Sequence, residues 1–160
     1  WQTALTYNLA KTVFDIEVIA LQSEFNMMKR EAYQEVEELL KYVKMNFIPF
    51  FPLASGFLTG KYKKNVIPKG SRGEWADHMK VMFSDKYYNF IANLGKITKR
   101  KKITLPELAI SWLLYYENIT SVICGVRSIE QLKMNIKSAN YLLDNDDLKQ
   151  IDDAYSFLIS

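Results

Sequence analysis

The sequence predicts an α/β fold with parallel strands, and three observations support this prediction. Short runs of β-branched and aromatic residues alternate with longer segments of helical periodicity. No repeat or long linker divides the 160 residues, which suits a single domain over 1–160. Only three strands are expected, and three parallel strands would leave two open edges. We therefore expect the chain to be part of a larger α/β fold.

The first half of the chain contains two of the expected strands. Apolar residues at helical spacing predict an opening helix over residues 1–13. The run "IEVIALQ", residues 16–22, predicts a buried strand, and a helix is expected over residues 31–44. The run "NFIPF", residues 46–50, predicts the second strand, although Pro49 removes one hydrogen-bond donor from its ladder.

A long excursion follows the second predicted strand. Residues 51–82 contain four glycines and no sustained periodicity, and a loop of that length in a compact domain is usually functional or mobile. A helix is then expected over residues 84–102. The sequence "TLPE", residues 104–107, matches a capping box and starts a helix that we expect to end near Tyr116.

The last part of the chain holds the third expected strand, "TSVIC", residues 120–124. The sequence "SIEQ", residues 128–131, matches a second capping box and opens another helix. The acidic group "DNDD", residues 144–147, lacks the spacing and the glycine of a calcium loop, so no metal site is expected there. We interpret it as the cap of a final helix that ends near Tyr155.

Composition favours a small anionic ligand over other partners. The net charge is +3, and the basic run at residues 99–102 has no interleaved aromatic residues, which indicates a solvated helix end and no nucleic-acid partner. Cys124 is the only cysteine, so it cannot form an internal disulfide, and a cytoplasmic location is expected. No apolar run is long enough to predict a membrane span. We expect Cys124 to be a buried apolar group.

Polar and aromatic residues follow the predicted strands where ligands bind in parallel α/β folds, at their carboxyl ends. The first strand ends at Gln22 and the second at Phe50. The third is followed by Gly125, Arg127 and a helix that begins at Ser128, and a helix N-terminus attracts phosphate. Basic residues on the excursion add positive charge. An amide, a flat aromatic ring and several phosphate-directed groups suit a nicotinamide dinucleotide.

Five motifs carry a resemblance to a known family. These motifs are "LQSEFN", "FFPLASGFLTGKY", "GSRG", "TLPELAISWLL" and "SVICGVRSIEQLKMN". Together they resemble the C-terminal half of the aldo-keto reductases, and they are most similar to the long-loop branch that includes the potassium-channel β subunits. The resemblance implies a (β/α)8 TIM barrel of which this chain is the C-terminal part only, with strands six to eight and their helices. It also implies NADPH bound across the C-terminal face of the barrel.

The resemblance assigns cofactor roles to residues of this chain. Gln22 matches the glutamine that holds the nicotinamide carboxamide, and Phe50 matches the aromatic residue that stacks on the ring. The remaining matches line the pyrophosphate, clamp the phosphates or surround the adenosine and its 2′-phosphate. They are Pro52, Leu53, Ser55, Gly56, Lys61, Arg72, Gly125, Val126, Arg127, Gln131 and Asn135.

The chain departs from the family pattern at three positions. Phe50 stands where the family has tyrosine or tryptophan, which keeps the stacking face. Phe51 stands where serine is common, and Met134 stands where an acidic residue often meets the adenine. Both of these departures weaken the cofactor interpretation. Arg127 has the opposite effect, because a fixed cation beside a 2′-phosphate favours NADPH over NADH.

The resemblance implies reduction of a small aldehyde or ketone by hydride transfer, but the chain has no catalytic residues to match. The family's catalytic aspartate, tyrosine, lysine and histidine lie on the first four strands. His78, the only histidine, is in the excursion and is not expected to act as an acid or base. Since the chain begins at Trp1, we expect a missing N-terminal half as its partner. Two alternatives stay open: a non-catalytic nucleotide-binding or regulatory module, and a fragment that folds only with its other half.

Overall fold

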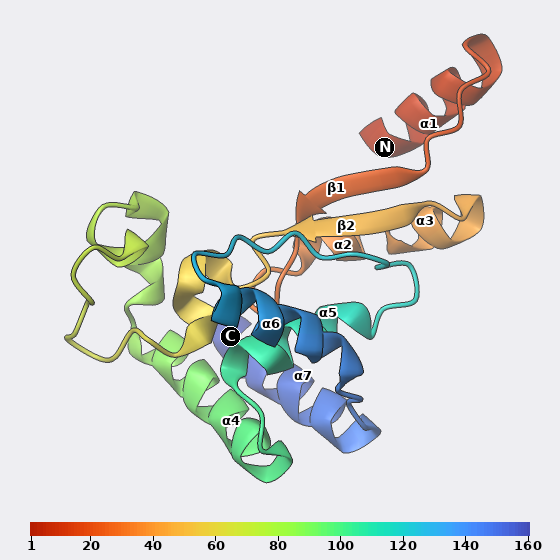
Figure 1. Ribbon diagram of the computed structural model, residues 1–160. Coiled ribbons are helices and arrows are strands. Elements are labelled where there is room, and N and C mark those ends of the chain that lie inside the picture. The colour runs from red at the N-terminus through yellow and green to blue at the C-terminus, as the bar shows by residue number, and fades with distance from the viewer.

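The structure is a computed structural model that describes residues 1–160. It contains seven α-helices and two β-strands, with short 3₁₀ helices in the excursion (Figure 1). In chain order the helices and strands are α1 (Gln2–Val13), β1 (Ala20–Glu24), α2 (Glu31–Gln34), α3 (Glu37–Val43), β2 (Asn46–Phe50), α4 (Asp85–Lys101), α5 (Leu105–Leu114), α6 (Ile129–Lys137) and α7 (Asn145–Ile159).

The two strands form a parallel pair, as the alternation of helices and strands predicts. Gln22 lies opposite Ile48, and Glu24 lies opposite Phe50. The predicted bounds of β2 are confirmed, whereas β1 begins and ends later in the chain than predicted. Because β2 begins at Asn46, the residues before Ala20 have no strand opposite them, apart from a hydrogen bond from the N–H of Asn46 to the carbonyl of Ile19.

The predicted third strand at residues 120–124 is wrong, because this segment has no regular strand structure. Residues 118–123 run beside β2 and share two backbone hydrogen bonds with it. Phe47 N–H donates to Asn118 O, and Ile123 N–H donates to Pro49 O. Both bonds are on the side of β2 that faces away from β1. Pro49 has no N–H to donate on that side, so the ladder is interrupted between the two bonds.

The predicted helices form, with one difference. The expected helix over residues 31–44 is divided into α2 and α3 at Glu35–Val36. The predicted capping box of α5 is confirmed, since the hydroxyl of Thr104 accepts from Glu107 N–H and the Glu107 carboxylate accepts from Thr104 N–H at 2.7 Å. The acidic group also forms the predicted cap, and α7 continues to Ile159.

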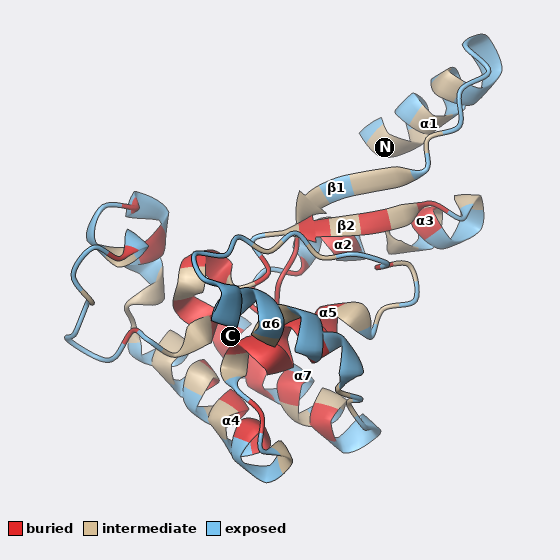
Figure 2. Cartoon of the chain, in the orientation of Figure 1, coloured by how far each residue is buried: buried red, intermediate tan, exposed pale blue.

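The core lies where α4, α5 and α7 pack together beneath the strands (Figure 2). Helix α5 is its centre, since eight of its ten residues are buried. An aromatic cluster joins α5 to the strands: the rings of Phe25 and Tyr33 stack at 4.6 Å, and Trp112 lies 5.1 Å from Phe25. This core holds the ends of the strands in place and so positions the residues described below.

Two helices keep largely exposed apolar side chains, although Tyr7 of α1 packs against the core. Helix α1 lies apart from the helical body and has no buried residue (Figure 1). Helix α6 also has no buried residue, and Ile129 and Ile136 on it are largely exposed. The structure therefore has one two-strand parallel sheet and two helices with exposed apolar side chains. None of the helices is long and apolar enough to span a membrane.

Candidate functional site

A cavity of about 550 Å³ lies at the carboxyl end of β2. Its walls come from the end of β2, the following turn, the excursion, the start of α5, residues 123–127 and α6. The lining residues are Phe50, Phe51, Pro52, Leu53, Ser55, Gly56, Thr59, Lys61, Ser71, Arg72, Pro106, Ile123, Cys124, Gly125, Arg127, Gln131, Met134 and Asn135.

The turn after β2 has an unusual backbone that leaves N–H groups available. Ala54, Ser55 and Gly56 have φ values of +46°, +57° and +93°, a left-handed run that costs free energy for residues other than glycine. The N–H groups of Leu53 and Ser55 have no acceptor elsewhere in the chain. Successive N–H groups in such a turn form a concave site for an anion.

Lys61 places its ammonium group over the same turn. A Cβ on Gly56 would lie 2.9 Å from Lys61 Nζ, so any other residue would push the end of the lysine side chain aside. Thr59 supports this arrangement, because its hydroxyl donates to Gly56 O at 2.8 Å and accepts from Lys61 N–H at 3.4 Å. A cation and free N–H groups therefore meet at one wall of the cavity.

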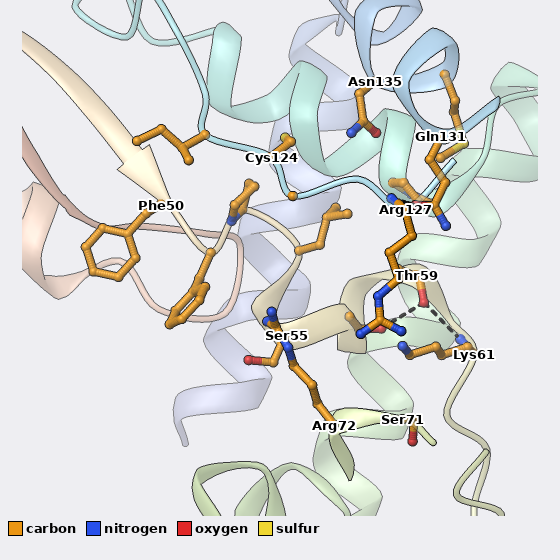
Figure 3. A pocket seen from close by; sticks show the side chains of 18 residues that line it. Phe50, Ser55, Thr59, Lys61, Ser71, Arg72, Cys124, Arg127, Gln131 and Asn135 are labelled. Atoms are coloured by element: carbon orange, nitrogen blue, oxygen red, sulfur yellow. Dashed lines mark hydrogen bonds between the residues drawn. The ribbon is translucent and has the colours of Figure 1, made fainter. Parts of the chain in front are cut away.

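The cavity is positively charged. Lys61, Arg72 and Arg127 reach it from three separate segments (Figure 3), and no aspartate or glutamate lines it. The guanidinium of Arg72 also lies 5.8 Å from the centre of the Phe51 ring, a cation–π distance that ties the excursion to the end of β2. Such a cavity favours an anionic ligand with more than one charge.

The N-terminus of α6 forms the opposite wall. The Ser128 hydroxyl accepts from Gln131 N–H at 3.3 Å, which is one half of the predicted capping box. The other half differs from the prediction, because the Gln131 side chain accepts from Arg127 N–H at 2.9 Å. This bond fixes the backbone of Arg127 next to the helix end, where the helix dipole also favours negative charge.

Two polar side-chain atoms in the cavity wall have no partner in the chain. Ser71 Oγ and Asn135 Oδ1 are buried and make no hydrogen bond. Buried polar atoms are rarely left unpaired, because each one costs free energy until a partner is found. The free N–H groups and the three cations suit a ligand that carries phosphates.

The structure brings most of the predicted cofactor residues together. Of the thirteen, all line the cavity except Gln22 and Val126. Gln22 lies in the middle of β1, because β1 ends two residues later than predicted, and its side chain is exposed. Val126 is 41% exposed and lies between two lining residues on an extended segment, where alternate side chains point in opposite directions.

Sequence reasoning did not propose every lining residue. Thr59, Ser71, Pro106, Ile123 and Cys124 also line the cavity. Thr59 and Ser71 could have been found, since each lies within two residues of a predicted cation. Cys124 differs from the expectation of a buried core residue, because it is only partly buried. Desolvation raises the pKa of its thiol to about 11, which makes it a weak nucleophile at neutral pH.

The geometry describes a binding site without an acid or a base for catalysis. No tyrosine, histidine or carboxylate lines the cavity. In a comparison with known proteins, the sequence profile of the Aldo/keto reductase family matches residues 2–156. The chain belongs to the aldo/keto reductase family. The family implies a TIM-barrel-type fold, of which this aldo/keto reductase chain shows only a two-strand parallel sheet.

Individual relatives agree with the family. The chain is 33% identical over 147 residues to the L-glyceraldehyde 3-phosphate reductase of Escherichia coli O157:H7. This match covers 86% of the chain and 41% of the relative. The fold of this chain is similar to that of a glycerol dehydrogenase from Gluconobacter oxydans, with a TM-score of 0.73 and 18% identity. The match covers 86% of this chain and 42% of the dehydrogenase. The chain therefore spans less than half the length of these proteins.

Proposed function

We propose that this chain is the cofactor-binding part of an NADPH-dependent aldo/keto reductase that reduces small aldehydes or ketones. The observation that carries the proposal is the cavity itself, in which three cations, two free backbone N–H groups and no carboxylate face one space. Bound NADPH would supply the hydride. The long excursion at residues 51–82 supports a place in the long-loop branch of the family.

The chain's own residues have distinct roles in this proposal. Lys61, Arg72 and the turn at Ser55 hold the pyrophosphate, and the Phe50 ring forms the face on which the nicotinamide stacks. Arg127, fixed beside the N-terminus of α6, holds the 2′-phosphate and so favours NADPH over NADH. Asn135 lines the part of the cavity assigned to the adenosine.

The acid–base groups and the rest of the barrel would come from outside this chain. The exposed apolar faces of α1 and α6 support a missing N-terminal half that packs against them. The name of the relative from Escherichia coli suggests a short phosphorylated aldehyde as the first substrate to assay. The test is loss of NADPH absorbance when the natural polypeptide is mixed with glyceraldehyde 3-phosphate and with unphosphorylated short aldehydes.

A second function fits one specific observation. Because no acid or base lines the cavity, the protein could bind a nucleotide without catalysis, as a regulatory module. Saturable NADPH binding with no turnover of any carbonyl would favour this module. Turnover that requires NADPH would favour the reductase, and absence of nucleotide binding would contradict both functions.

A further inference from the structure

One titratable side chain outside the cavity contacts its wall. The hydroxyl of Ser55 lies 3.0 Å from Nε2 of His78, which belongs to the 3₁₀ helix Asp77–Met82 of the excursion. Ser55 is 7% exposed and lines the cavity, whereas His78 is exposed and lies behind it. The contact joins two segments that are 23 residues apart. Nothing in the roles described above uses His78.

The backbone of Ser55 limits what its hydroxyl can reach. With φ at +57°, between two more left-handed residues, Ser55 has little freedom to turn. Its N–H has no acceptor in the chain, so the N–H and the O–H of one residue are both available to one anion. Figure 3 shows Ser55 and Arg72 on the same side of the cavity. Whether the hydroxyl donates to a ligand depends on its other partner.

A hydroxyl has one hydrogen to donate, and His78 decides where it goes. If Nε2 carries no proton, Ser55 donates to His78 and presents only lone pairs, which repel a phosphate. If Nε2 carries the proton, it donates to Ser55 Oγ, and the Ser55 hydrogen is free to bond a phosphate oxygen. The neutral imidazole with its proton on Nε2 is sufficient, so the charge of His78 need not change.

We propose that His78 is a positioning residue that directs the Ser55 hydroxyl toward a phosphate of the ligand in the cavity. This inference rests on the proposed function, since it assigns the ligand's pyrophosphate to this turn. It predicts a hydrogen-bond chain from His78 Nε2–H to Ser55 Oγ–H to a phosphate oxygen. Bonds of this kind to an anion are stronger than bonds between neutral groups.

The test compares two ligands on the natural polypeptide and its variants. S55A and S55G should each weaken NADPH binding about tenfold, because both remove the hydroxyl although only glycine relieves the left-handed backbone. H78L should weaken NADPH binding about fivefold, and H78Q should bind NADPH nearly as tightly as wild type because its amide also donates. The double variant H78L/S55A should bind NADPH no more weakly than S55A alone. Adenosine 2′-monophosphate, which keeps the 2′-phosphate and has no phosphate at the pyrophosphate position, should bind all variants equally.

A spectroscopic measurement separates orientation from a structural role. In nitrogen-15 spectra, with the His78 signals assigned by comparison with H78Q, NADP⁺ should shift His78 toward the form with its proton on Nε2. Equal NADPH affinity in wild type and H78L, or a His78 whose Nε2 carries no proton in the NADP⁺ complex, would overturn this inference. A wild-type protein that binds no NADPH would overturn the proposed function as well.

Discussion

Lys61 lies directly over Gly56, with its Nζ 2.9 Å from the position that a Cβ on the glycine would occupy. The left-handed backbone at Gly56 and the positive charge of Lys61 therefore share one place in the cavity wall. Gly56 is the residue of the left-handed turn with the largest φ, +93°, and its missing side chain leaves the space that the ammonium group fills. The turn and the cation are therefore parts of one anion site.

The first prediction follows from this packing. G56A should lower the free energy of unfolding by about 1–2 kcal/mol, because alanine is strained at this φ, and should weaken NADPH binding because the new methyl group displaces Lys61. Gly95, within α4, has no atom within 4 Å of an added Cβ and is the matched control. G95A should stabilise the protein by about 0.5–1 kcal/mol and leave NADPH binding unchanged. Equal effects of G56A and G95A on binding would count against the site.

Cys124 offers a chemical probe of the cavity wall. Burial raises the pKa of its thiol to about 11, so the thiolate fraction, and with it the alkylation rate by iodoacetamide, should rise about tenfold per pH unit from pH 7 to pH 10. NADP⁺ should slow this alkylation, because a ligand in the cavity covers the thiol. The readout is mass spectrometry of the peptide that contains Cys124. An alkylation rate that saturating NADP⁺ does not change would contradict the placement of the cofactor.

The cap of α7 should make stability depend on acid pH. The N–H of Asp147 and the ammonium of Lys101 lower the pKa of Asp144 to about 2. Because this folded-state pKa is below the ordinary value, the cap's contribution is full above about pH 4 and is lost as the pH falls toward 2. In D144S the hydroxyl keeps the cap without titrating. Urea unfolding from pH 5 to pH 2 should therefore show a steeper loss for wild type than for D144S. Parallel curves would show that Asp144 does not carry the effect.

Pro49 interrupts the ladder between β2 and residues 120–124, and replacing it tests whether the missing donor prevents the third strand. P49V supplies an N–H on the side of β2 that faces residues 120–124, while keeping an apolar side chain at this buried position. The added donor should increase protection of that segment from hydrogen exchange. I48V, which changes the neighbouring residue on the β1 side, is the control and should leave this protection unchanged. No gain in P49V would mean that another feature prevents the strand.

The fold was predictable where local signals are strong. Capping boxes such as that of Thr104 mark helix starts through specific hydrogen bonds, and their positions are confirmed. Strand limits are less predictable, because they depend on what lies opposite: Ile16 fits a strand as well as Leu21 does, but only Leu21 has a partner across the pair. The missing donor of Pro49 interrupts the ladder that the third strand needs, and only the three-dimensional register shows which side of β2 lacks it.

In the candidate site, too, local sequence signals predict some residues, whereas others depend on the three-dimensional arrangement. The cations Lys61 and Arg127 were predictable, because each follows a strand end or a glycine-containing turn. The positions of Gln22 and Val126 were not, since one residue of shift or alternation decides which way a side chain points. The contact between Ser55 and His78 joins residues far apart in the sequence, and no local pattern indicates it.

The most direct test of the account is the dissociation constant of NADPH and of NADH for the natural polypeptide, its R127Q variant and a K149Q control. Lys149 is an exposed cation of α7 outside the cavity, so both substitutions remove one positive charge. We expect saturable NADPH binding that R127Q weakens about tenfold, with NADH binding unchanged and K149Q equal to wild type. Absence of saturable NADPH binding, or equal losses in R127Q and K149Q, would contradict it.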